Sequence, residues 1–229
     1  MAIADERLDS TAEPSRSTLL HPMPAASMNG SEKLKSGVHR TRGLPQSEAE
    51  NQEGFERMST SLYELCVPNY LQTLGAVAGF LEKGLTHCKG AGIDPKEIVE
   101  ARLAPDMLPF RFQVISVVHH SLGAVNGLVA GLFSPPPDRT LDYQGLQQLV
   151  VDSRDGLKKL TPDEVDRHAG RDITFQLGEA KIPFTAEGFI LSFSLPNFYF
   201  HAATAYDILR VKGAPLGKRD FLGSLRMKR

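Results

Sequence analysis

The sequence predicts an all-α protein, a bundle of four long helices with a small β-hairpin before the last one. Two observations support this fold class. Apolar residues recur every three or four positions over four long stretches, and short segments rich in proline and glycine separate them. Short connections favour antiparallel neighbours, as in a helical bundle. The chain has 229 residues, of which 41% are hydrophobic, which suffices for one domain with its own core.

The first 57 residues are expected to form a disordered N-terminal tail. They are rich in Ser, Glu, Pro, Gly and Arg, and Phe55 is their only aromatic residue. Such a segment buries too little apolar surface to offset the entropy lost on ordering. Early acidic residues, including Asp5 and Glu6, argue against a mitochondrial targeting peptide. The folded domain is therefore expected over residues 58–223, with a basic C-terminal end over 224–229.

The first long helix is predicted to start near Ser61 and to end at Gly90 and Gly92. We expect Pro68 in its first turn, where proline is tolerated best. A buried stripe at helical spacing consists of Leu71, Leu74, Ala78, Leu81, Leu85 and Cys88.

Further helices follow the same logic. Asp94, Pro95 and Glu97 resemble a cap, a first-turn proline and a capping-box glutamate, and predict a short helix to about Ala101. A second long helix is expected between Pro109 and the three prolines at 135–137. Its predicted buried stripe is Ile115, Val118, Leu122, Val125, Val129 and Leu132. The third runs over about 141–160, and 161–164 is predicted to cap a short continuation.

Residues 172–185 change from helical to alternating periodicity and predict the β-hairpin, expected to be the only β-structure and to lie near the start of the last helix. Pro183 places its second arm at a sheet edge. The last helix is predicted over about 186–212, with a kink at Pro196 and an end at Gly213.

Composition argues against several classes of function. The net charge is −1 without a basic patch, so no nucleic-acid partner is expected. We expect no membrane partner either, because no stretch approaches the length of a membrane span. Without a secretory signal, a cytoplasmic location is expected. Cys66 and Cys88 cannot form a zinc cage alone. No nucleophile elbow, P-loop or dinucleotide fingerprint is present.

Several motifs resemble those of a family of bacterial and fungal proteins of unknown function, grouped with the DinB-like four-helix bundles. They are LPNFYFH at 195–201, AYDILR at 205–210, PLGKRDFLG at 215–223, SLYEL at 61–65 and ARLAPDM at 101–107. The resemblance covers roughly residues 58–223. It implies a DinB-like four-helix bundle.

The wider DinB-like group is similar to metal-dependent bundles with three histidines, two of them in an HxxxH pair on one helix. Its members include thiol-dependent isomerases and transferases. This chain departs from the pattern, because Ala205 stands four residues after His201. A divalent metal is nevertheless one candidate cofactor that the resemblance suggests.

His201 is the first candidate catalytic residue. Asn197 and Thr204 share its helix face, as does Ser194, and a polar stripe on so apolar a helix needs partners inside the bundle or water. We expect His201 to face an internal cavity as a neutral imidazole, with Asn197 and Thr204 as ligand-binding neighbours that fix its tautomer. The alternative is a structural histidine bonded to a backbone carbonyl.

His87 and His119 are the other candidate metal ligands. Antiparallel helices could bring His87, His119 and His201 to similar depths, and three imidazoles with an open position suit zinc, nickel or iron. The alternatives are that His119 borders the core with a solvated ring and that His87 interacts with its helix C-terminus. His120 is expected to point more toward solvent.

The closing segment, 215–223, and Tyr206 complete the candidate ligand-binding residues. Lys218 and Arg219 could line a site for an anionic ligand, or the segment could be tied to the bundle by salt bridges.

Two hypotheses for function follow. The favoured one is a small-molecule-binding or accessory protein, with a homodimer as one further expectation. The alternative is a DinB-like metal-dependent hydrolase, or a thiol-dependent transferase or isomerase.

Overall fold

The computed structural model describes residues 60–137 and 139–228. The predicted tail over 1–57 lies outside the described residues. The first described helix is α2, Leu62–Ala91, which starts where expected because the Ser61 side chain accepts a hydrogen bond from the backbone N–H of Glu64. Gly92, at a φ of 68°, ends it in the left-handed conformation that glycine adopts without strain. Pro68 lies inside α2, so its predicted first-turn position is wrong.

The second long helix consists of α4 (Phe110–Val118), a π-helical segment η1 (His119–Gly123) and α5 (Ala124–Ala130). Gly131, at a φ of 67°, ends it before the three prolines that were expected to do so. Val129 is 63% exposed and Leu132 lies in a strand, so the last two positions of the predicted buried stripe are wrong.

The run from Phe110 to Ala130 is long and apolar enough, by length and composition alone, to cross a membrane, although no such stretch was expected. Within this run, 61% of the 18-residue stretch that meets the criterion is buried inside the protein. The core helices of globular proteins meet the same criterion.

Side-chain caps start three further helices, and those at Asp94 and Thr161 were predicted. Asp94 caps α3 (Pro95–Val99) by accepting from the N–H of Lys96, without the expected contribution of Glu97. Asp142 caps α6, Tyr143–Lys158. Thr161 and Glu164 form a complete capping box at the start of α7, Pro162–Asp166.

The predicted hairpin is confirmed as β2 (Asp172–Leu177) paired antiparallel with β3 (Ala180–Thr185). It is not the only β-structure, because β1 (Leu132–Phe133) pairs parallel with β2. The sheet order β1-β2-β3 leaves β3, with Pro183, at an edge as expected. The hairpin leads directly into the last long helix.

That helix consists of α8 (Ala186–Phe189), a second π-helical segment η2 (Ile190–Ser194) and α9 (Leu195–Val211). Pro196, where a kink was predicted, directly follows the π-helical segment near the start of α9. Gly213, at a φ of 89°, follows the helix end as predicted.

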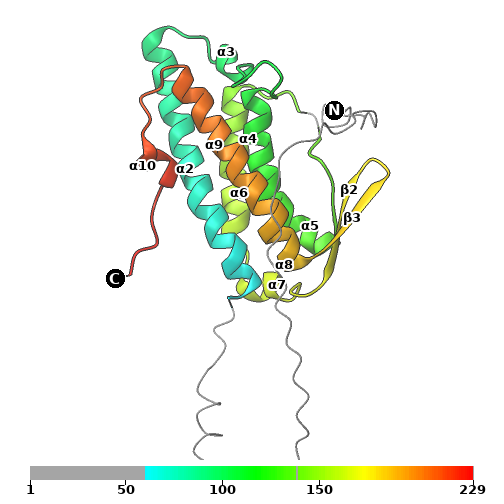
Figure 1. Cartoon of the computed structure of the whole chain (residues 1–229). Coiled ribbons are helices and arrows are strands. Elements are labelled where there is room, and N and C mark those ends of the chain that lie inside the picture. Colours follow the sequence, from blue (N-terminus) through cyan, green and yellow to red (C-terminus); the bar gives the residue numbers. More distant parts are fainter. Residues whose placement is uncertain (1–59, 138, 229) are drawn as a thin grey trace, which may run out of the picture. The chain divides into compact units, whose positions relative to one another are not determined.

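The four long helical runs lie side by side in Figure 1, with α9 against α4 and α2 against α6. Their shared core includes large side chains with no exposed surface, among them Tyr70, Phe80, Phe110 and Phe198. The fold is thus the predicted helical bundle with a small sheet at its side.

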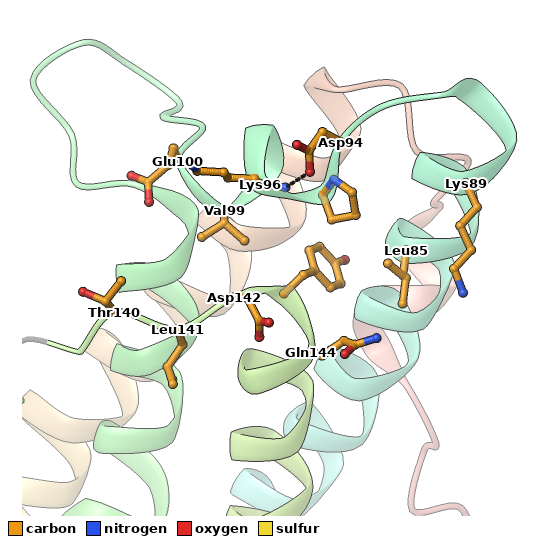
Figure 2. Close-up of a pocket in the computed structure, with 12 residues that line it drawn as sticks. Leu85, Lys89, Asp94, Lys96, Val99, Glu100, Thr140, Leu141, Asp142 and Gln144 are labelled. Carbon is orange, nitrogen blue, oxygen red and sulfur yellow. Dashed lines mark hydrogen bonds between the residues drawn. The ribbon is translucent and has the colours of Figure 1, made fainter.

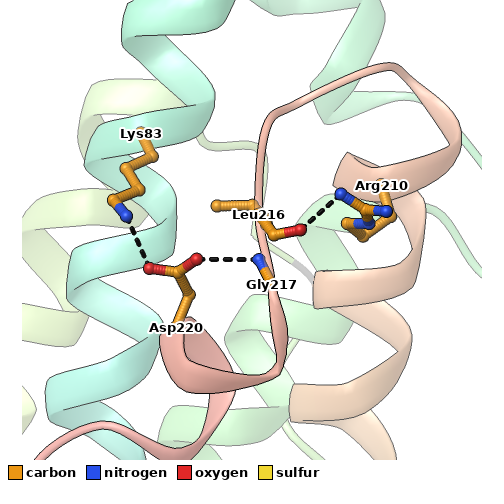
Figure 3. Close-up of polar contacts among 5 residues, drawn as sticks. All are labelled: Lys83, Arg210, Leu216, Gly217 and Asp220. Carbon is orange, nitrogen blue, oxygen red and sulfur yellow. Dashed lines mark hydrogen bonds and ion pairs between the residues drawn. The ribbon is translucent and has the colours of Figure 1, made fainter.

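The closing segment docks on α2 through α10, Lys218–Leu222 (Figure 3). Asp220 accepts a 2.6 Å hydrogen bond from the Lys83 ammonium and another of 2.8 Å from the N–H of Gly217. The Arg210 guanidinium donates to the carbonyl of Leu216. These contacts hold the segment by its backbone and one acidic side chain.

Candidate functional site

Buried polar side chains gather where α4 and η1 face α9. On the α4 side these are Gln113, Ser116 and His120, with exposed fractions of 2%, 1% and 7%. His201 of α9 is half-buried opposite them. We call these four residues the histidine seam. Polar groups at this depth cost free energy unless they find partners, so their contacts decide what the seam can do.

His201 is held by Gln113. Its Nδ1 lies 2.8 Å from the Gln113 side-chain oxygen, and the Gln113 amide group donates to the carbonyl of Leu108 at 2.8 Å. The Leu108 carbonyl can only accept, so it fixes which end of the amide faces His201. The amide oxygen can only accept in turn, so Nδ1 carries the hydrogen. Neutral His201 therefore presents a bare lone pair at Nε2.

His120 lies beside His201. The two rings are nearly parallel, at 17°, with centroids 5.9 Å apart. Burial, followed by the nearby His119 and His201, lowers the pKa of His120 from 6.5 to about 3. Burial and then His119 lower the pKa of His201 to about 4. Both imidazoles are therefore neutral at physiological pH, as was expected for His201.

Two seam atoms lack a hydrogen-bond partner among the described residues. They are Ser116 Oγ and His120 Nδ1, both buried. Ser116 of α4 and His120 of η1 are four residues apart, about one helical turn. Two unpaired buried groups about one turn apart mark a place where a water or a ligand would gain hydrogen bonds.

The two π-helical segments meet at this point. The Ser194 hydroxyl of η2 donates to the backbone carbonyl of His120 in η1 at 2.8 Å. Because the Ser194 hydroxyl uses its single hydrogen in that bond, it accepts from the Tyr70 hydroxyl, which lies 2.7 Å away. Extra residues in a helical turn are frequent at functional sites, since they re-aim side chains. Here the contact between the two segments fixes the backbone of His120.

His119 precedes His120 in the chain, and its ring is held by other partners. Its Nε2 donates to the carbonyl of Ser134 at 2.7 Å, and the ring stacks on Phe133 at 4.3 Å. Burial lowers its pKa, and the bond to Ser134 partly opposes this. His119 also lines a small pocket of about 200 Å³.

His87 does not join the other histidines. Its Nε2 lies 3.0 Å from the carbonyl of Lys212, just beyond α9. At roughly 1.5 Å per residue, Lys212 is about 16 Å along the helix from His201. The expectation that His87, His119 and His201 lie at similar depths is therefore wrong. His87, on α2, lies beside the C-terminal end of α9, whereas His201 lies in the middle of α9.

Other predicted site residues are engaged locally. Asn197 donates to the carbonyl of Phe193 and Thr204 to that of Phe200, each on its own helix. They do not fix the His201 tautomer; Gln113 does. Tyr206 packs edge-on between Phe80 and Phe221. Lys218 and Arg219 lie exposed in α10, where the neighbouring Asp220 makes the contacts with the bundle.

Three seam residues escaped sequence reasoning: Gln113 and Ser116 were not considered, and His120 was expected to face solvent. A signal was present, because Gln113, Ser116 and His120 follow one another at helical spacing within a mainly apolar helix.

The candidate metal ligands His87, His119 and His201 are not arranged around a common point where a metal ion could bind. Within residues 60–137 and 139–228, no group of three or more His, Cys, Asp or Glu side chains could hold one. Ala205 occupies the position where an HxxxH partner of His201 would stand.

Comparison with known proteins agrees with this fold. The family described as "Domain of unknown function (DUF1993)" matches residues 62–222. A crystal structure of a DinB family member protein from Shewanella denitrificans is similar, with a TM-score of 0.63 and 24% identity over 73% of this chain and 95% of that chain. So low an identity establishes the fold alone. Among curated proteins none matches. The chain thus belongs to the DUF1993 family of unknown function and has the fold of the DinB-like bundles.

Proposed function

We propose that this protein is a small-molecule-binding helical bundle and that the histidine seam is its binding site. The observation that carries the proposal is the pair of unpaired buried atoms, Ser116 Oγ and His120 Nδ1. A folded protein seldom leaves two such atoms about one turn apart unless something else bonds to them.

The chemistry of the seam defines the ligand. His201 offers a lone pair at Nε2, and the low pKa values of His120 and His201 keep both rings uncharged. Aromatic rings pack against both histidines. The ring centroid of Phe193 lies 5.6 Å from that of His120, and the ring centroid of Phe112 lies 5.9 Å from that of His201. The ligand that fits is a small neutral molecule with a hydrogen-bond donor and an apolar or aromatic body.

The enzymatic alternatives have less support. A metal-dependent hydrolase would need ligands that the described residues do not assemble. A thiol-dependent transferase or isomerase would need its thiol from a co-substrate, because both cysteines are buried and burial raises the pKa of Cys66 to about 12. A buried thiol with so high a pKa is a poor nucleophile.

A fragment screen by saturation-transfer NMR on the full chain tests the proposal. The counter-screen uses His120→Phe, which keeps a ring of similar size but removes both nitrogens. His168→Phe is the matched control, because His168 is also 7% exposed and also has an unpaired Nδ1, yet is not part of the seam. Fragments with a neutral donor should bind the wild type and the control but not His120→Phe. Hits that bind all three proteins alike would count against the seam as the site.

A further inference from the structure

A second pocket lies at one end of the bundle, where α3 approaches α2 and α6 (Figure 2). It has a volume of about 460 Å³, within the range of roughly 300–1,000 Å³ that small-molecule pockets occupy. Tyr70 of α2 bonds to Ser194, which in turn bonds to the backbone of His120. At roughly 1.5 Å per residue, Leu85 of this pocket is about 22 Å along α2 from Tyr70. The pocket is therefore separate from the histidine seam.

The pocket has an apolar side built from four segments of the chain. Leu85 comes from α2, Pro95 and Val99 from α3, Leu141 from the segment before α6, and Tyr143 from α6 itself. Because α2, α3 and the start of α6 are held together by the bundle, the apolar side exists before any ligand arrives.

The acidic groups around the pocket are already engaged. Asp94 accepts a 2.9 Å hydrogen bond from the N–H of Lys96, and Asp142 accepts one of 2.7 Å from Gly145, each at a helix start that favours negative charge. Glu100 forms a 2.9 Å ion pair with Arg111. Each of these three carboxylates therefore already has a hydrogen-bond or ion-pair partner within the protein.

The two lysines of the pocket differ in this respect. Lys89 lies on the α2 side and Lys96 on the α3 side (Figure 2). No ion pair formed among residues 60–137 and 139–228 includes either ammonium group. An anionic group at the mouth of the pocket would find two positive charges on opposite sides.

We propose that this pocket binds a small amphipathic organic anion, a monocarboxylate whose hydrocarbon body lies against Leu85, Val99 and Tyr143. Its carboxylate lies at the mouth, between Lys89 and Lys96. Apolar burial supplies most of the affinity and the lysines select the sign of the charge.

Sodium decanoate, below its micellar concentration, is the probe. In amide NMR spectra of the full chain it should cause saturable shifts at the residues lining this pocket. The double variant Lys89→Glu/Lys96→Glu should weaken binding by at least about fivefold and remove its salt dependence. Lys181→Glu, on the exposed strand β3, is the control for a single charge reversal away from the pocket and should change binding less than about twofold.

A second variant tests the proposal independently, in case the double variant does not fold. Gln144 is exposed and lines the pocket, so Gln144→Trp should obstruct the mouth without disturbing the core, and should weaken binding by about tenfold or more. The proposal is overturned if decanoate causes no saturable shifts in this pocket, or if Gln144→Trp binds like the wild type. It is also overturned if decyltrimethylammonium binds as tightly as decanoate, or if the Lys181 control loses as much affinity as the double variant.

Discussion

Acidification should destabilise this protein well above the range in which carboxylates titrate, because His120 and His201 stay neutral in the fold. Burial is the main cause of both lowered pKa values, about 3 and about 4 against an ordinary value of 6.5. Between the folded and unfolded pKa values the unfolded chain binds more protons. The free energy of unfolding therefore falls as the pH drops below the unfolded value.

The magnitude follows from the same pKa values. A histidine with an unfolded pKa of 6.5 that stays unprotonated in the fold loses about 2 kcal/mol between roughly pH 7 and pH 5. His120 and His201 together therefore predict a loss of about 4 kcal/mol, an order-of-magnitude value. Burial also lowers the pKa values of His119 and His168, which add to the loss.

The variant His120→Phe isolates one of these contributions. Urea unfolding followed by circular dichroism, at about pH 7 and pH 5, gives the loss for each protein. The loss should be smaller by about 2 kcal/mol in His120→Phe than in the wild type. Equal losses in the two proteins would refute the argument that His120 is buried and neutral.

Three further predictions concern positioning, packing and the tail. Side-chain ¹⁵N NMR should show His201 protonated at Nδ1 at neutral pH; Gln113→Leu should release this tautomer, whereas Gln113→Glu should keep it and raise the pKa of His201. A Cβ added at Gly84 would lie 2.5 Å from the Tyr143 hydroxyl, so Gly84→Ala should destabilise the protein by about 1–3 kcal/mol in urea unfolding. Gly79→Ala, with nothing within 4 Å of its added Cβ, should instead be neutral or stabilising by up to about 1 kcal/mol. Removal of residues 1–57 should leave the melting temperature unchanged, and a large fall would contradict the predicted tail.

The helices could be predicted because local chemistry specifies them. Ser61, Asp142 and Thr161 cap the helices they precede, and Gly92 ends α2, each through contacts within a few residues. The hairpin was equally predictable from its alternation. Strand β1 was not, because two residues become a strand only by pairing with a segment far along the chain.

The seam was harder to predict, for a physical reason. Apolar periodicity identified a stripe through Ile115 and Val129, yet the buried side of this helix carries polar residues such as Gln113 and Ser121. Because these buried residues are polar, the spacing of apolar residues alone does not identify the buried side of the helix. Partners across the bundle decide their orientation, as the contact of Gln113 with His201 illustrates.

The most direct test of the proposed binding site is side-chain ¹⁵N NMR of the histidines in the full chain during titration with the tightest-binding neutral fragment. The account predicts saturable shifts of the ring nitrogens of His120 and His201, since these line the site. The nitrogens of His87, at the far end of α9, and of His168 should not move. Shifts confined to His87 or His168, or saturable binding that leaves His120 and His201 unchanged, would contradict the assignment of the histidine seam as the binding site.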